Sequence, residues 1–292
     1  MKKYDIAILG AGVTWGVIGL FTRSLGAAGL TSAGVLIVRS GGCALLFALW
    51  ALLRDPGLFR VRGRDIWLVA LFGGVTFFFT YCYYRSIDLG SLSMACTLMY
   101  SAPVFVMVMS LFFFGERFSR RKLFALLCAV AGCTLVSGVL EGNAAGGAAA
   151  VIFGLLAGIG YAGYSVCIKA LSNRGLDTLT INVWGWTLCA LLGLVVWGPA
   201  DAAPAFATGR TVLLAVGLVV VSGFLPALLY SLGLRGEEAG KGAVMASVEP
   251  VVASLAGLVA FGETPTALGA LGIVLVLAAV ALLNLGKKPE AE

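Results

Sequence analysis

Apolar residues occupy most of this chain, in runs of about twenty separated by short polar segments. A run of that length, wound as an α-helix, crosses the hydrocarbon core of a bilayer. The pattern predicts ten spans, at residues 5–25, 31–53, 66–86, 92–114, 122–140, 148–171, 178–198, 211–233, 241–261 and 266–286. The predicted fold is therefore all-α and integral to the membrane, and the loops leave no room for a soluble domain.

Prolines interrupt the fourth and ninth of these runs. Pro103 and Pro250 are each followed, twelve residues later, by a Gly-Glu pair, Gly115-Glu116 and Gly262-Glu263. A proline inside a helix leaves a backbone carbonyl without its partner, and lipid cannot satisfy that carbonyl. One such proline indicates a simple kink, whereas matching interruptions in two halves of a chain are typical of a transporter's central site.

Other matches between the two halves keep nearly the same spacing. The segment Cys43–Leu46 recurs 146 residues later as Cys189–Leu192, and Trp15 falls on Tyr161 at that offset. A second copy of five spans must enter the membrane from the opposite side, because five is odd. We therefore expect two inverted five-helix repeats, at residues 1–142 and 148–287, joined by an external linker at Glu141–Ala149.

Basic residues predict the orientation of the bundle. If the N-terminus is cytoplasmic, sixteen Lys and Arg residues lie inside and three outside, namely Arg23, Arg85 and Arg210. Cytoplasmic loops carry such an excess, so both termini and the loop Arg54–Asp65 are expected in the cytoplasm. The first apolar run is too long for the core of a cleavable signal peptide.

Composition excludes several function classes. The 292 residues are 60% hydrophobic and 12% charged, and the net charge of +6 is carried by short loops, so no nucleic-acid partner is indicated. Histidine is absent, which excludes His-based metal sites and Ser/His dyads. The seven cysteines lie within apolar runs and are expected to be packing residues. We expect no enzyme activity, no cofactor and no metal.

Charged residues within the spans are the first candidates for function. Glu249 is the only acidic residue near the middle of a span, where a carboxylate is costly unless protonated, paired or hydrated. It is either a substrate-binding or proton-carrying group or a structural carboxyl. Arg39 could extend outward to water, bind a substrate carboxylate or pair with an acid. Glu116 and Glu263 are expected to be structural, at the glycine turns.

Aromatic residues are the second group of candidates. Five lie deep in spans one, three, four and six and are predicted to line a cavity, with plain packing as the alternative: Trp15, Tyr81, Tyr100, Tyr161 and Tyr164. Tyr84 and Tyr230 lie near span ends and are expected to be packing residues or interface anchors. We expect no lysine or arginine at the midplane. The cavity would then suit a neutral, zwitterionic or cationic solute with an apolar portion.

The ten spans, the paired Pro…Gly-Glu segments and Arg39 together resemble the drug/metabolite transporter superfamily, in particular its EamA family of ten-helix bacterial exporters. The resemblance covers essentially the whole chain. It implies a secondary carrier of small metabolites, often amino acids, working by alternating access in a bacterial inner membrane. It also implies a cavity lined by spans one, three, four, six, eight and nine. Glu249 has Ala102 as its counterpart, so any coupling role would be asymmetric.

The expected function is transport of a small organic solute, with amino acids first and quaternary amines or other cations second. Proton coupling is an open alternative, and the protein is expected to act as a monomer or homodimer in the lipid bilayer. An accessory subunit of a membrane complex is the alternative from another class. A membrane enzyme is disfavoured, because the spans contain no acid/base pair, metal cluster or nucleophile constellation.

Overall fold

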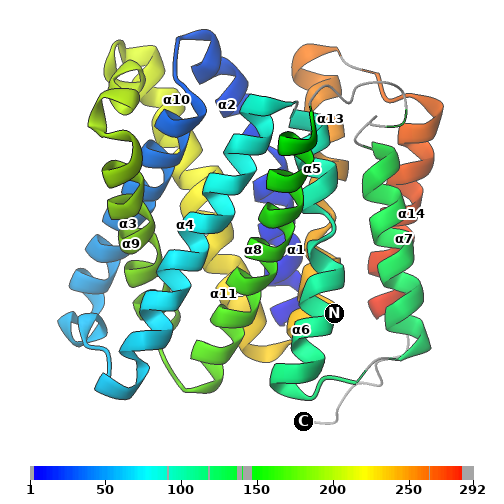
Figure 1. Ribbon diagram of the computed structural model, residues 1–292, viewed down its shortest axis with the longest axis horizontal. Helices are drawn as coiled ribbons and strands as arrows, with labels where there is room; N and C mark the ends of the chain where they lie inside the picture. Colours follow the sequence, from blue (N-terminus) through cyan, green and yellow to red (C-terminus); the bar gives the residue numbers. More distant parts are fainter. Residues whose placement is uncertain are drawn as a thin grey trace.

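The computed structural model describes residues 3–90, 92–117, 119–136, 140, 147–262 and 264–284. These residues form one bundle of helices that run roughly side by side (Figure 1), with no β-strand among them. The helices in the first part of the chain are α1 (Lys3–Gly16), α2 (Ile18–Ala27), α3 (Ser32–Arg54), α4 (Ile66–Leu89), α5 (Leu92–Met99), α6 (Ala102–Phe114) and α7 (Arg120–Val136). Those that follow are α8 (Ala148–Asn173), α9 (Thr178–Trp197), α10 (Gly209–Val219), α11 (Leu225–Gly236), α12 (Ala239–Ala246), α13 (Glu249–Phe261) and α14 (Ala267–Asn284). Glu263 and most of the predicted linker, residues 141–146, lie outside the described residues.

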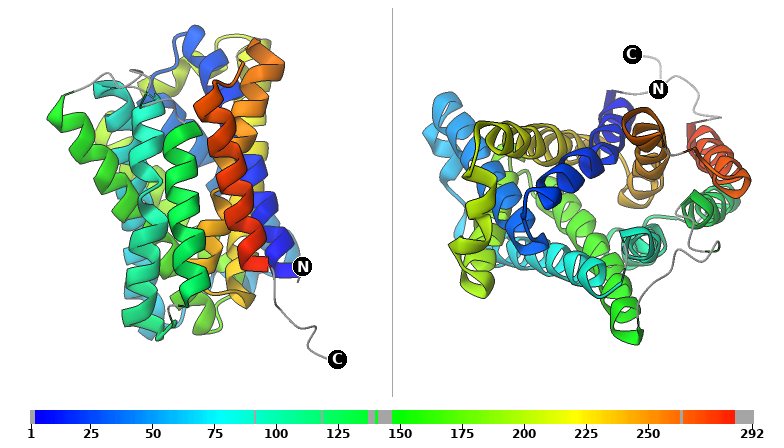
Figure 2. Two further views of the ribbon diagram at one scale, coloured as in Figure 1. Left: turned by 90° about the vertical axis from the view of Figure 1, so that its right-hand side faces the viewer. Right: turned by 90° about the horizontal axis from the view of Figure 1, so that it is seen from above.

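Among the described residues, eight helical stretches are long and apolar enough to cross a membrane, which confirms a multi-pass helical membrane protein. They are Lys3–Ala27, Ser32–Arg54, Gly63–Leu89, Met94–Phe114, Ala148–Asn173, Thr178–Trp197, Gly209–Gly236 and Ala239–Ala260. The two remaining predicted spans coincide with the shorter helices α7 and α14. These two pack against each other at one side of the bundle (Figure 2), so the other helices surround its centre.

Both prolines lie where one helix ends and another begins. Pro103 is in the first turn of α6 and Pro250 in the first turn of α13, where a helix needs no N–H donor from the proline. The preceding turns are tight: Ser101 N donates to Leu98 O at 3.1 Å, and Ser247 N donates to Val244 O at 3.3 Å. Each proline therefore starts a new helix at the depth of the bundle's centre.

Glycines set the ends and the neighbours of these broken helices. Gly115 and Gly262 end α6 and α13 in the left-handed conformation, at φ 64° and 71°, which glycine adopts without steric cost. Gly16 of α1 lies against the second break, where an added Cβ would stand 2.7 Å from Glu249 O. Gly158 of α8 lies against the first break, where an added Cβ would stand 2.4 Å from Ser101 Oγ. A side chain at Gly16 or Gly158 would therefore push α1 or α8 away from a break.

A third irregular segment was not predicted from the sequence. The run 211–233 is divided into α10, a π-helical segment at Val220–Phe224, and α11. Pro226, which lies in the first turn of α11, lacks the donor that a regular helix would use there. Single π-helical turns inside helices are frequent at functional sites, and this one packs against α3.

Candidate functional site

A small cavity lies where the two broken helices meet. The first break contributes Met99, Tyr100, Ala102 and Pro103, the second contributes Ala243, Ala246, Ser247 and Glu249, and α8 contributes Tyr161. Its volume is about 10 Å³, which is room for about one water molecule. Two segments far apart in the sequence therefore face one small space.

Glu249 is the acidic group of this cavity. As the first residue of α13 it lies at the positive end of the helix dipole, which favours a negative charge. Tyr100, Tyr161 and Arg39 are close enough to interact with it electrostatically. No hydrogen bond or ion pair to its carboxylate is found among the described residues. Within that part of the chain, the carboxylate is available to a solute, a proton or water.

An aromatic cluster extends from the cavity into the bundle. The Trp15 ring centroid lies 5.3 Å from that of Tyr230 and 6.2 Å from that of Tyr161. Tyr164 stacks on Tyr230, with centroids 6.2 Å apart and planes 12° apart. A hydrogen bond of 2.9 Å between the hydroxyls of Ser165 and Tyr230 fixes that ring. Helices α1, α8 and α11 are thus joined through aromatic rings beside the cavity.

Most of the predicted aromatic residues come together here. Tyr100 and Tyr161 line the cavity, and Trp15 and Tyr164 lie in the cluster behind Tyr161. Tyr81 lies elsewhere, 5.2 Å from Trp197 and 5.8 Å from Phe77 between ring centroids. The structure leaves Tyr81 outside the group that surrounds Glu249.

Of the two roles expected for Tyr230, the structure supports packing and not an interface anchor. Its side chain is fully buried at the centre of the cluster, because α11 packs against both α1 and α8. The only polar residue next to Tyr230 in the sequence is Ser231, which by itself does not reveal which face of the helix is buried. Tyr84 is also buried, at 4% exposure.

Arg39 lies inside the bundle. It is 8% exposed, so it does not extend outward to water. Its guanidinium lies 5.5 Å from the Trp186 ring centroid, and the π-helical segment contacts its stem, because a Cβ at Gly223 would stand 3.3 Å from Arg39 Cγ. Glu249, Tyr84 and Tyr164 are its electrostatic neighbours. The bundle interior therefore holds a positive group as well as a negative one.

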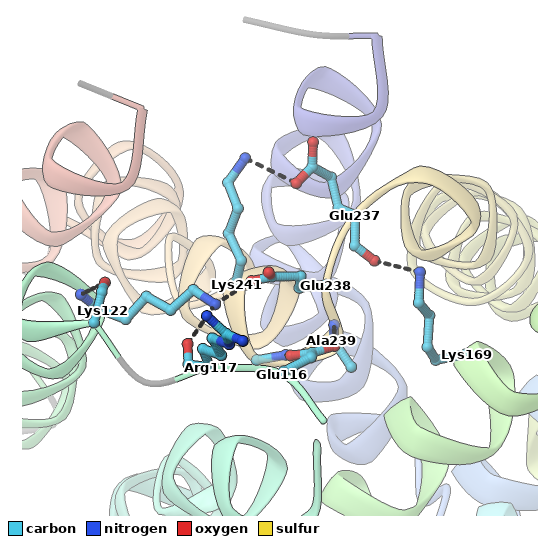
Figure 3. A network of polar contacts seen from close by, with 10 residues as sticks. Glu116, Arg117, Lys122, Lys169, Glu237, Glu238, Ala239 and Lys241 are labelled. Atoms are coloured by element: carbon cyan, nitrogen blue, oxygen red, sulfur yellow. Dashed lines mark hydrogen bonds and ion pairs between the residues drawn. The ribbon is translucent and has the colours of Figure 1, made fainter. Parts of the chain in front are cut away.

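A second polar cluster lies at the end of the bundle where α1 begins (Figure 3). Lys241 of α12 forms ion pairs with Asp5 of α1 and, at 3.1 Å, with Glu237. Lys169 donates to the Glu237 carbonyl at 2.8 Å, which ties α8 to the same segment. We call Asp5, Lys169, Glu237 and Lys241 the end cluster. Sequence reasoning missed it, because its members are up to 236 positions apart.

Glu116 joins this end of the bundle from another direction. Its carboxylate accepts hydrogen bonds from the backbone N–H groups of Ala239, at 2.9 Å, and Gly240, at 3.3 Å, and so caps α12. Burial raises the pKa of Glu116, although these two donors act in the opposite direction. Beside it, Lys122 pairs with Glu238. The expected structural role at a glycine turn thus includes a contact between α6 and α12.

A membrane-spanning helical bundle with two interrupted helices, a central acid and an aromatic cluster defines a membrane transport protein. Comparison with known proteins gives the family. The sequence model of the EamA-like transporter family matches residues 2–138 and 148–285, so the chain belongs to that family. It is accordingly a transporter and not an enzyme.

Named relatives are similar along nearly the whole chain. The pseudopaline exporter of Pseudomonas aeruginosa is 27% identical, over 96% of this chain and 98% of its own. An uncharacterized transporter of Archaeoglobus fulgidus is 29% identical, over 96% of both chains. A Streptantibioticus cattleyicolor protein named "Probable terminal-alkyne amino-acid exporter" is 29% identical, over 80% of both. A crystal structure at 20% identity superposes with a TM-score of 0.79, covering 96% of this chain and 95% of that chain, and so shares the fold.

Proposed function

We propose that this protein is a secondary-active exporter of small organic metabolites, with amino acids as the first substrate class. One observation carries the proposal: the two broken helices meet at one small cavity that holds Glu249 and borders the aromatic cluster. Backbone groups freed at a helix break and a carboxylate can bind polar groups of a solute, while aromatic faces accept its apolar portion. The names of the pseudopaline and amino-acid exporters support this class.

The proposed mechanism is alternating access between two inverted five-helix repeats. The breaks before Pro103 and Pro250 lie 147 residues apart. Each is approached by a glycine of the first helix of the other half, Gly158 for the first break and Gly16 for the second. The end cluster would close the cavity toward the cytoplasm, because it joins α1, α8 and α12 by buried charges. Its ion pairs would separate when that side opens.

Glu249 is the proposed coupling group. Its carboxylate lies in the cavity, where a solute and a proton would compete for it. A bacterial inner membrane supplies a proton gradient, so inward proton movement would drive outward solute movement. The first half has Ala102 at the matching position, and one carboxyl would carry this role alone.

Purified protein in liposomes tests the proposal. We expect a preloaded amino acid to leave proteoliposomes faster than it leaves protein-free liposomes, and faster still when the solute side is made alkaline and the opposite side acidic. A chain that moves no solute by itself would favour an accessory subunit of a membrane complex. Quaternary amines belong in the same panel, because the aromatic cluster also suits cations.

A further inference from the structure

Arg39 is a buried cation that forms no ion pair within the described part of the chain. It lies on α3 at 8% exposure, and no carboxylate within the described part of the chain is at ion-pair distance from it. Burying a lone charge is costly, and charged residues inside membrane bundles mark the paths of solutes or ions. An arginine with a purely structural role would normally have its donors satisfied by backbone carbonyls or acids. Arg39 therefore calls for an anionic partner that the described residues do not supply.

Several buried donors surround it and are unused as well. The Arg39 Nε atom, the Tyr164 hydroxyl and the Trp186 indole N–H lack a hydrogen-bond partner among the described residues, and the Tyr84 hydroxyl lies close to the Arg39 guanidinium. The two tyrosines are electrostatic neighbours of Arg39, and the Trp186 ring lies 5.5 Å from its guanidinium. These side chains come from four helices, α3, α4, α8 and α9. A positive charge among converging donors matches a planar anion that accepts several hydrogen bonds.

We propose that Arg39, with Tyr84, Tyr164 and Trp186, binds the carboxylate of the transported solute. This assignment rests on the proposed transport function and narrows its substrate to amino acids and other carboxylates that carry a positive group. The planar guanidinium forms two parallel hydrogen bonds with a carboxylate, a geometry that lysine does not reproduce. Tyr164 and Tyr161, with ring centroids 6.1 Å apart, connect this positive pole with Glu249 at the other pole. The interior thus holds one positive and one negative group, which match the two charges of a zwitterion.

The chemistry of the ligand tests this assignment before any variant is made. Thermal-shift titrations of the purified full chain would compare each L-amino acid with its methyl ester, which keeps the ammonium and loses the carboxylate charge. We expect the amino acid to bind at least tenfold more tightly than its ester. Equal binding of acid and ester by the wild-type protein, or binding of esters alone, would overturn the carboxylate site. Flux of esters in liposomes would still support transport, whereas no flux of any solute would overturn the proposed function itself.

Variants then test whether Arg39 is the residue that binds the carboxylate. Arg39→Gln should remove the tenfold preference for the acid, and Arg39→Lys should leave a part of it. Arg85→Gln is the matched control, because Arg85 also has an unpartnered Nε within the described residues and lies beside an aromatic ring, that of Phe153 on α8 at 6.0 Å. It should keep the full preference. If Arg39→Gln does not fold, the milder double variant Tyr84→Phe, Tyr164→Phe should reduce the preference at least threefold; an unchanged preference in either variant counts against the proposal.

Discussion

At the scale of single residues, the aromatic cluster gives the most direct test of where a solute binds. Trp15 and Tyr161 contact each other beside the cavity, so removing either ring would remove the apolar wall of the site. Tyr161→Ala and Trp15→Ala should each weaken solute binding at least several-fold, and replacement by Phe should be milder, because a face remains. Equilibrium binding to purified protein measures this.

The control for these variants is Trp67→Ala, since Trp67 is 57% exposed at the beginning of α4, away from the cluster. It should leave affinity unchanged within about twofold. Tyr81→Ala decides the role of the one predicted aromatic residue that packs elsewhere, against Trp197. Indifference to both Trp15→Ala and Tyr161→Ala would remove the aromatic cluster from the binding site.

Glu249 carries the second prediction at this scale. If its carboxyl takes up and releases a proton in each cycle, Glu249→Gln should abolish the dependence of transport on a pH gradient, because an amide cannot titrate. Proteoliposome flux with and without the gradient measures this, and Glu238→Gln, at the end of the bundle, serves as the control. A folded Glu249→Gln protein that keeps gradient-driven flux would return this residue to a structural role.

The sequence shows which residue types lie deep within the spans, but it does not show which way their side chains point. Glu249 stands out because a carboxyl within an apolar run is rare. The inward orientation of Arg39 and Tyr230 leaves no comparable mark, since helices surrounded by lipid and by other helices are apolar on every face. Their orientation is set by packing against α9 and α1, which a single sequence does not reveal.

At the scale of helices, the breaks themselves are testable. Pro103→Ala and Pro250→Ala restore the N–H groups that a continuous helix would use. We expect the double variant to be as thermostable as the wild type or more so, and to transport at least tenfold more slowly, because continuous helices would fill the cavity with backbone. Transport and melting temperature are measured on the same preparations. Pro226→Ala, next to the π-helical segment, is the control. It shows whether the loss of transport is specific to the prolines of the two matched breaks.

The position of these breaks was predictable, whereas the contacts between elements were not. A proline in an apolar run marks a local backbone conformation, which depends on that residue and its neighbours alone. The ion pair between Asp5 and Lys241 depends on how α1 and α12 meet after the whole chain has folded. The π-helical segment was predictable only in part, because Pro226 indicates an irregularity in the helix but not its type.

The cap that Glu116 places on α12 gives a prediction with a pH dependence. Glu116→Ala should lower the free energy of unfolding by about 1 kcal/mol, the usual cost of a lost cap, while Glu116→Gln keeps an acceptor and should cost less. Burial raises the pKa of Glu116 in the folded protein, so the folded state binds its proton more tightly than the unfolded state. The stability that Glu116 contributes is then fully present below its unfolded pKa. It declines as the pH rises through the folded pKa.

Denaturation of wild type and Glu116→Gln from pH 4 to pH 8 measures this. The stability of the wild type relative to the variant should fall as the pH rises, because only the wild type can ionise at this position. A difference that grows with pH would show that the two backbone donors on α12 outweigh the effect of burial.

At the scale of the whole molecule, charge and topology together predict how the bundle lies in the membrane. The beginning of α1, the end of α14 and the loop before α4 lie at one end of the bundle, and the turn between α2 and α3 lies at the other (Figures 1 and 2). Basic residues crowd the first end, with Arg54, Arg60, Arg62 and Arg64 in a single loop. An excess of Lys and Arg marks the cytoplasmic side of a membrane protein. We therefore predict that this end faces the cytoplasm.

Cysteine labelling decides the orientation in intact cells. Ala28 and Gly63 are exposed at opposite ends of the bundle, and no neighbour lies within 4 Å of a Cβ placed at Gly63. A membrane-impermeant maleimide should label Ala28→Cys in intact cells and should label Gly63→Cys only after the cells are opened. The parent protein is the control, because its seven native cysteines are buried or half-buried. Labelling of Gly63→Cys but not Ala28→Cys in intact cells would reverse the orientation, and the end cluster would then close the external side.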